Sequence, residues 1–127
     1  MVNVVIWNEF VHEQEDEHVK SIYPKGIHGC IKEFLSDDKS LNIKTATLEE
    51  KDHGLSEELL DKTDVLIWWG HKAHKLVEDK IVDRVQQRVL EGMGLLVLHS
   101  GHHSKIFKRM MGTTANIRWA ERGEMER

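Results

Sequence analysis

The sequence predicts an α/β fold in which a parallel sheet is covered by helices on both faces. Four short apolar runs, at residues 2–7, 41–48, 64–69 and 94–99, alternate with segments that repeat apolar residues at helical spacing. The chain of 127 residues has one proline and no repetitive tract, as expected for a single domain over residues 1–127. We therefore expect a βαβαβαβα order with right-handed crossovers, which gives parallel strands.

The four apolar runs differ in ways that predict their places in the sheet. VNVVIW (2–7) is rich in β-branched residues, and DVLIWW (64–69) is apolar throughout, so both are expected to be buried strands. LNIKTATL (41–48) alternates apolar and polar residues, which is typical of an edge strand. GLLVLH (94–99) is the fourth strand. With the second strand at an edge, we expect a flavodoxin-like, doubly wound sheet of order 2-1-3-4.

The segments between the strands carry helical signals. IHGCIKEFL repeats apolar residues at i, i+3, i+4 and i+7, so we expect its Cys30 to lie in the core. Ser56 is placed to cap a short helix, and Gly92 to end a long one that begins near Val77. A last helix includes Ile106 to Met111. The tail beyond it has no apolar period after Ile117 and Trp119, so we expect an arm or the start of another element.

Charge and composition exclude several functional classes. The net charge is −4, and the basic cluster of Lys105, Lys108 and Arg109 has the helical spacing of a solvated face, so we expect no nucleic-acid partner. No apolar run is long enough to cross a membrane, and the first strand follows Met1 without a signal peptide. The single cysteine fits a reducing compartment. We expect a cytoplasmic protein with no membrane partner.

The histidines are the most informative feature. Ligands of open parallel sheets bind at the carboxyl ends of the strands. Six of the nine histidines follow the first, third and fourth strands closely: His12, His71, His74, His99, His102 and His103. We therefore expect the site at that edge of the sheet, and we interpret His18, His28 and His53 as ordinary surface residues.

Three interpretations of this cluster remain open. The first is a divalent metal, zinc or manganese, held by His12, His71, His99 and His102. The second is metal-free acid–base chemistry by Glu9, His99 and His102. In the third, the imidazoles only bond loop backbones and line a cleft. In each case the residues expected to contact a ligand are Asn8, Trp69, His74 and Lys105, with one of the neighbouring tryptophans, or Trp7, as an apolar floor.

The turn HSGHH (99–103) resembles a nucleophile elbow, because a serine and a glycine connect a strand to a helix. It lacks the glycine that precedes the serine in the tight form of that turn. Ser100 is therefore interpreted as a nucleophile, or else as a helix cap or a residue that hydrogen-bonds the substrate, with Gly101 relieving the turn.

Several motifs in order resemble the ThuA-like family of trehalose utilization proteins: WNEFVHE, YPKGIHG, TATLEEKDHGLSEELLDKTDVLIWWGHKAH and VQQRVLEGMGLLVLHSGHHSKIFKRMMGT. The resemblance implies a class I glutamine amidotransferase-like fold and a role in the catabolism of trehalose and related disaccharides. It further implies a small-molecule sugar substrate, which we expect to be a 3-keto-sugar intermediate made by partner dehydrogenases. Ser100 and Gly101 stand where amidotransferases carry their cysteine, so we do not expect glutaminase activity.

The resemblance leads to two functional hypotheses. The chain is either an enzyme that abstracts a proton next to a keto-sugar carbonyl, followed by elimination or hydrolysis, or a non-catalytic sugar-binding or regulatory module. Members of the family are usually about twice as long, so we expect this chain to correspond to the amino-terminal half. Half a sheet would leave an edge uncovered, and we therefore expect a homo-oligomer.

Overall fold

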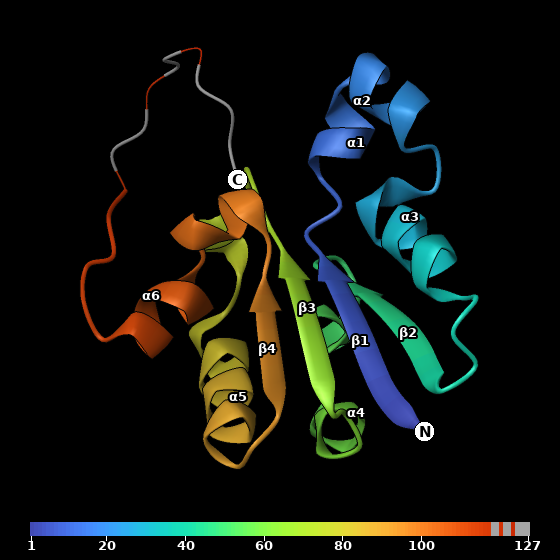
Figure 1. The fold of residues 1–127 in the computed structure, drawn as a ribbon. Coiled ribbons are helices and arrows are strands. Elements are labelled where there is room, and N and C mark those ends of the chain that lie inside the picture. The colour runs from blue at the N-terminus through green and yellow to red at the C-terminus, as the bar shows by residue number, and fades with distance from the viewer. Residues whose placement is uncertain (118–119, 121–122, 124–127) are drawn as a thin grey trace.

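The computed structural model describes residues 1–117, 120 and 123, so Trp119 and most of the tail, for which we expect an arm or the start of another element, lie outside the described residues. Four strands form one parallel sheet of order β2-β1-β3-β4, which confirms the predicted topology (Figure 1). Their bounds are β1 Val2–Asn8, β2 Leu41–Thr47, β3 Val65–Trp69 and β4 Gly94–Val97. Val4 of β1 is paired with Ile43 of β2 on one side and Val65 of β3 on the other. All four strands therefore end at the same edge.

Helices cover both faces of this sheet. α3 packs on β1 and β2, and α4 and α5 pack on the opposite face, where α6 contacts α5. The helices are α1 His12–Glu15, α2 Glu17–Ile22, α3 Gly26–Leu35, α4 Glu57–Asp61, α5 Asp79–Leu90 and α6 Lys105–Met111. Among the described residues there are also three short 3₁₀ turns: η1 Lys51–Gly54, η2 His74–Leu76 and η3 His99–His103.

The larger core lies between the sheet and the helices α4 and α5. Trp7 and Trp68 stack there with ring centroids 3.9 Å apart, and both are 1% exposed. The Trp7 indole N–H donates to the carbonyl of His53 at 3.0 Å. Trp7 is therefore part of the core, and the prediction that it forms a ligand floor is wrong. Trp69 follows Trp68 on the strand, so it points to the other face and stays partly exposed.

The apolar face of α3 is rotated relative to its prediction. Ile31 and Leu35 pack against the smaller core, which lies on the face of the sheet that α3 covers, whereas Phe34 is 82% exposed. Cys30 is also exposed, so its predicted burial is wrong. The helix turns His28 toward the sheet instead, which makes the prediction of a surface His28 wrong as well.

Several predicted boundaries are confirmed. Ser56 caps α4 by accepting from the backbone N–H of Leu59. The last helix includes Ile106 to Met111 as predicted, and Gly112 follows it with a φ of +69°. β2 is an edge strand, as its alternating pattern predicts, and β4 is the other edge. The predicted end of the fourth strand at His99 is two residues too late, since β4 ends at Val97. The η3 turn begins at His99, whose φ of +36° is not that of a strand. Of the helices described, none has the length and apolar character needed to span a membrane.

Candidate functional site

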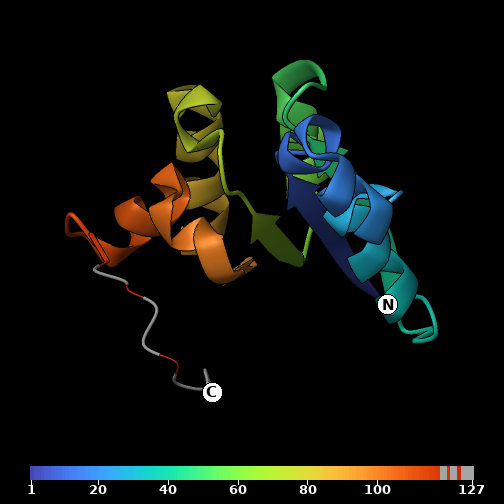
Figure 2. The ribbon, with the colours of Figure 1, turned by 90° about the horizontal axis from the view of Figure 1, so that it is seen from above.

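Three of the predicted histidines lie together beyond β1, β3 and β4. His12 of α1 stacks on His71, with ring centroids 4.9 Å apart, and Trp69 stacks on His71 from 5.9 Å. The charge of His99 also acts on His71. Figure 2 looks onto this edge and shows the end of β3 lying between α1–α3 on one side and α5 and α6 on the other. We call His12, Trp69, His71 and His99 the imidazole–indole cluster.

The other three predicted histidines form a second group beside the first. His103 lies next to His102, with ring centroids 4.1 Å apart, and next to His74, at 6.1 Å. The Nδ1 of His102 is hydrogen-bonded to the carbonyl of His99 at 2.8 Å. Thus the sequence correctly predicts that six histidines gather at this edge, and the structure divides them into two groups of three.

Two of these imidazoles are uncharged at pH 7. Although His71 is exposed, partial desolvation by the surrounding protein lowers the pKa of its imidazole, and the nearby charge of His12 lowers it further. Burial also lowers the pKa of His74, with a smaller contribution from the charge of His103. Both rings are therefore neutral at pH 7 and each has a nitrogen that can accept a proton.

Glu9 is 1% exposed and holds the loop that carries His71 and His74. Its carboxylate accepts hydrogen bonds from the backbone N–H groups of His71, Lys72 and Ala73. The Lys72 and Ala73 nitrogens each lie 2.9 Å from the nearer oxygen. Both carboxylate oxygens are thus engaged by backbone donors, so the arrangement makes Glu9 the residue that fixes this loop.

The packing around Gly70 brings Glu9 and His74 close to each other. A Cβ at Gly70 would lie 3.1 Å from the Nδ1 of His74 and 3.3 Å from a carboxylate oxygen of Glu9. A side chain at position 70 would therefore require the imidazole or the carboxylate to move by a few tenths of an ångström.

A second buried polar network joins β1 to α1 and α3, and sequence reasoning missed two of its members. Asn8 is fully buried, and its amide N–H₂ donates to Glu13 at 2.7 Å and lies 2.9 Å from the Nδ1 of His28. Glu13, 2% exposed, also accepts from the backbone N–H of Ile27 at 2.9 Å. Burial lowers the pKa of His28. Asn8 thus uses its amide inside the protein, and no signal in the sequence distinguishes Glu13 from its solvated neighbours.

Ser100 does not cap α6. Its hydroxyl donates to the carbonyl of Gly70 at 2.8 Å, and the cap is Ser104, whose hydroxyl accepts from the backbone N–H of Phe107 at 3.2 Å. The helix begins four residues later than the capping prediction needs. Ser100 therefore ties the η3 turn to the end of β3, and its hydroxyl proton is directed at a backbone oxygen.

Two further predicted residues are also engaged by the backbone. His53 is 9% exposed; its Nδ1 is bonded to the carbonyl of Leu48 at 2.7 Å, and its Nε2 accepts from the N–H of Glu78 at 3.0 Å. The prediction that it is a surface residue is wrong. The ammonium of Lys105 donates to the carbonyl of Val77 at 2.6 Å and to Asp79 at 2.9 Å.

The predicted metal ligands are not arranged as a coordination shell. Across residues 1–117, 120 and 123, no three histidine, cysteine, aspartate or glutamate side chains are placed to hold one ion. His102, one of the four predicted ligands, lies in the group of His74 and His103 and not with His12 and His71. We therefore derive no chemical step through a metal.

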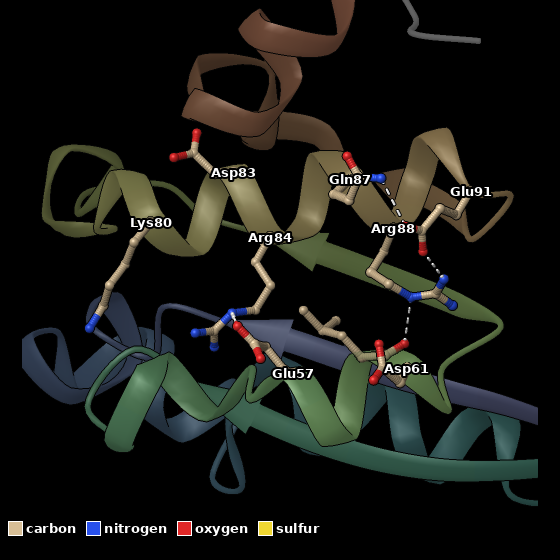
Figure 3. Close-up of a pocket in the computed structure, with 9 residues that line it drawn as sticks. Glu57, Asp61, Lys80, Asp83, Arg84, Gln87, Arg88 and Glu91 are labelled. Carbon is tan, nitrogen blue, oxygen red and sulfur yellow. Dashed lines mark hydrogen bonds and ion pairs between the residues drawn. The ribbon is translucent and has the colours of Figure 1, made fainter.

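A groove between α4 and α5 lies on the face that carries the larger core, and its charges are matched (Figure 3). Arg84 donates to the carbonyl of Leu55 at 2.8 Å, and Arg88 donates to that of Leu60 at 3.0 Å and to Glu91 at 2.7 Å. These bonds fasten the two helices to each other, so we interpret the groove as structural.

Comparison with known proteins gives one finding. The family model described as "ThuA: Trehalose utilisation" matches residues 3–126, which is nearly the whole chain. A search of curated proteins gives no match.

Proposed function

The chain belongs to the ThuA family and so has a role in trehalose utilisation, and we propose that it is an enzyme acting on a keto sugar derived from the disaccharide. The proposed reaction is proton transfer at the carbon next to the carbonyl. That proton is acidified by the carbonyl, so a neutral imidazole is a base of suitable strength.

The observation that carries this proposal is the pairing of His71 with Trp69. The imidazole of His71 is neutral at pH 7, and the partly exposed indole beside it offers an apolar face on which a sugar ring can lie. In the proposed step His71 takes the proton, and the electron pair of the C–H bond forms the double bond of an enolate. The enolate then re-forms the carbonyl: its electron pair makes a carbon–carbon double bond, the bond to the oxygen of the second sugar breaks, and that oxygen takes a proton from His12 or His99. Glu9 contributes by holding the loop of His71 in place.

A non-catalytic sugar-binding module is the second candidate, and one observation favours it. Glu9, Ser100 and His102, which the sequence suggested as catalytic groups, all make hydrogen bonds to the backbone. A site whose candidate catalytic groups are used in hydrogen bonds to the backbone is consistent with a protein that binds a sugar without converting it. Binding of 3-keto-trehalose without its consumption would support this candidate.

The test is to follow 3-keto-trehalose by nuclear magnetic resonance in the presence of the purified protein and two variants. We expect His71→Gln to lose at least about a hundredfold in turnover, as removal of a general base does. His18→Gln is the matched control, because His18 is exposed on α2 and is not a member of the cluster. Turnover by His71→Gln at the rate of the control would contradict the proposed role.

A further inference from the structure

Six basic side chains of this acidic chain line a pocket between η2 and α6, next to the second group of histidines. Its volume is about 700 Å³, within the range of small-molecule sites. None of the described residues that line it is acidic. Its basic residues are Lys72, His74, Lys75, His103, Lys105 and Lys108, and we call it the lysine pocket.

The groove in Figure 3 provides the contrast. It is lined by three cations, Lys80, Arg84 and Arg88, together with four acidic residues: Glu57, Asp61, Asp83 and Glu91. Charges in that groove therefore find their partners within the protein. The lysine pocket has four lysines and no carboxylate on its walls, so its charge is not neutralised in the same way.

Two of the four lysines are paired with carboxylates outside the pocket. Lys72 bonds to Glu15 at 2.6 Å, and Lys105 bonds to Asp79 at 2.9 Å. Within the described part of the chain, Lys75 makes no ion pair, and Lys108 donates only to the amide oxygen of Asn116 at 3.4 Å. Two unit charges are thus available to a ligand.

The histidines of the pocket leave this charge to the lysines. Desolvation lowers the pKa of the partly buried His74, and the pKa of the exposed His103 is lowered by slight desolvation and by the charges of His102 and Lys108. At pH 7 both imidazoles are neutral and can act as hydrogen-bond donors or acceptors.

We propose that the lysine pocket binds the oxyanion of a small ligand, a phosphate or carboxylate group, through Lys75 and Lys108. Lys72 and His74 belong to the loop that Glu9 fixes and that also carries His71. The pocket is therefore in a position to hold an anionic group while the imidazole–indole cluster contacts the sugar. This last step, that the anion is part of the sugar substrate, rests on the function proposed above.

The test measures binding without turnover. Isothermal titration calorimetry of the full chain would compare inorganic phosphate, glucose 6-phosphate, glucuronate and neutral glucose at low and high ionic strength. The variants are Lys75→Gln and Lys108→Gln, with Lys39→Gln as the matched control in an exposed turn. Circular dichroism verifies that each variant is folded.

We expect at least one anion to bind and each pocket variant to weaken it about fivefold, the effect of one unit charge at about 4 Å in water. High salt should weaken it further, and Lys39→Gln should not. Preference for glucose 6-phosphate identifies a phosphate ligand, and preference for glucuronate a carboxylate. The proposal is overturned if no anion binds, or if Lys39→Gln weakens binding as much as the pocket variants.

The two proposals fail separately. Anion binding by a protein that consumes no keto sugar would refute the proposed enzyme and leave the pocket assigned. Turnover of a neutral keto sugar by a protein that binds no anion would do the reverse.

Discussion

Replacement of Glu9 by glutamine should destabilise the protein, because the carboxylate is the acceptor for three consecutive backbone N–H groups. Its two oxygens accept from the amides of His71, Lys72 and Ala73. Glutamine keeps the shape but replaces one oxygen by a donor, so in either orientation at least one backbone N–H faces another N–H. An unsatisfied buried donor costs about 1–3 kcal/mol, and a hydrogen bond to a charged group contributes about 1.5–3 kcal/mol.

We therefore expect Glu9→Gln to lower the free energy of unfolding by about 3 kcal/mol, out of a total of roughly 5–15 kcal/mol for a domain of this kind. The assay is urea unfolding followed by tryptophan fluorescence, which reports on the buried Trp7 and Trp68. With a slope of about 1.5 kcal/mol per molar urea, the midpoint should fall by about 2 M.

Glu15→Gln is the matched control for this measurement. Glu15 is 57% exposed and bonds to the side chain of Lys72, so its loss should cost no more than about 0.5 kcal/mol. An unchanged midpoint for Glu9→Gln, together with a loss of turnover, would refute the reasoning. It would show that Glu9 is a reacting group and not the support of the loop.

Three further outcomes are expected. Ser100→Ala should retain turnover and lower the free energy of unfolding by about 1 kcal/mol, since the Ser100 hydroxyl bonds to the carbonyl of Gly70. Kinetics and urea unfolding check the two outcomes, and abolished turnover would restore the hypothesis that Ser100 is a nucleophile. Gly70→Ala should reduce turnover several-fold, because its Cβ would lie 3.1 Å from the Nδ1 of His74 and so shift the loop that also carries His71. Turnover by this variant at the wild-type rate would count against that contact. The free energy of unfolding should fall as the pH drops through about 6.5. Histidines with a lowered pKa in the folded protein bind protons less readily there than in the unfolded chain, so acid favours unfolding. The urea midpoint measured from about pH 8 to about pH 5.5 would test this, and a flat profile would contradict it. The histidines with a lowered pKa are His28, His71, His74 and His103.

The sheet is the part of the molecule that the sequence predicts well. Its order follows from one comparison, that LNIKTATL alternates whereas the runs at 2–7 and 64–69 do not. Such patterns report whether one or both faces of a strand are covered, which is a property of the strand alone. The gathering of six histidines at one edge follows from the same topology, because parallel strands end together.

The individual roles of side chains were harder to predict, because they depend on contacts between distant segments. The helical period of α3 predicts an apolar face but not the rotation that buries His28 and exposes Cys30. His53 looks like a loop residue until the start of α5 supplies the N–H of Glu78. Ser100 and Ser104 both precede a helix in the sequence, and only the extent of η3 decides which of them caps it.

The position of β1 in the sheet determines which strands open most and least often in local unfolding. β1 pairs over residues 2–8 with β2 and over residues 4–8 with β3, so its amides are bonded from both sides. β4 pairs over only four residues, and within the described part of the chain no strand pairs with its other side, where Leu96 is 52% exposed. Amide hydrogen exchange should therefore be slowest in β1, which ends at Asn8, and faster in β4. Glu9, the next residue after β1, bonds the loop of His71 to this most persistent strand, while the turn of His99 follows the strand that opens most readily.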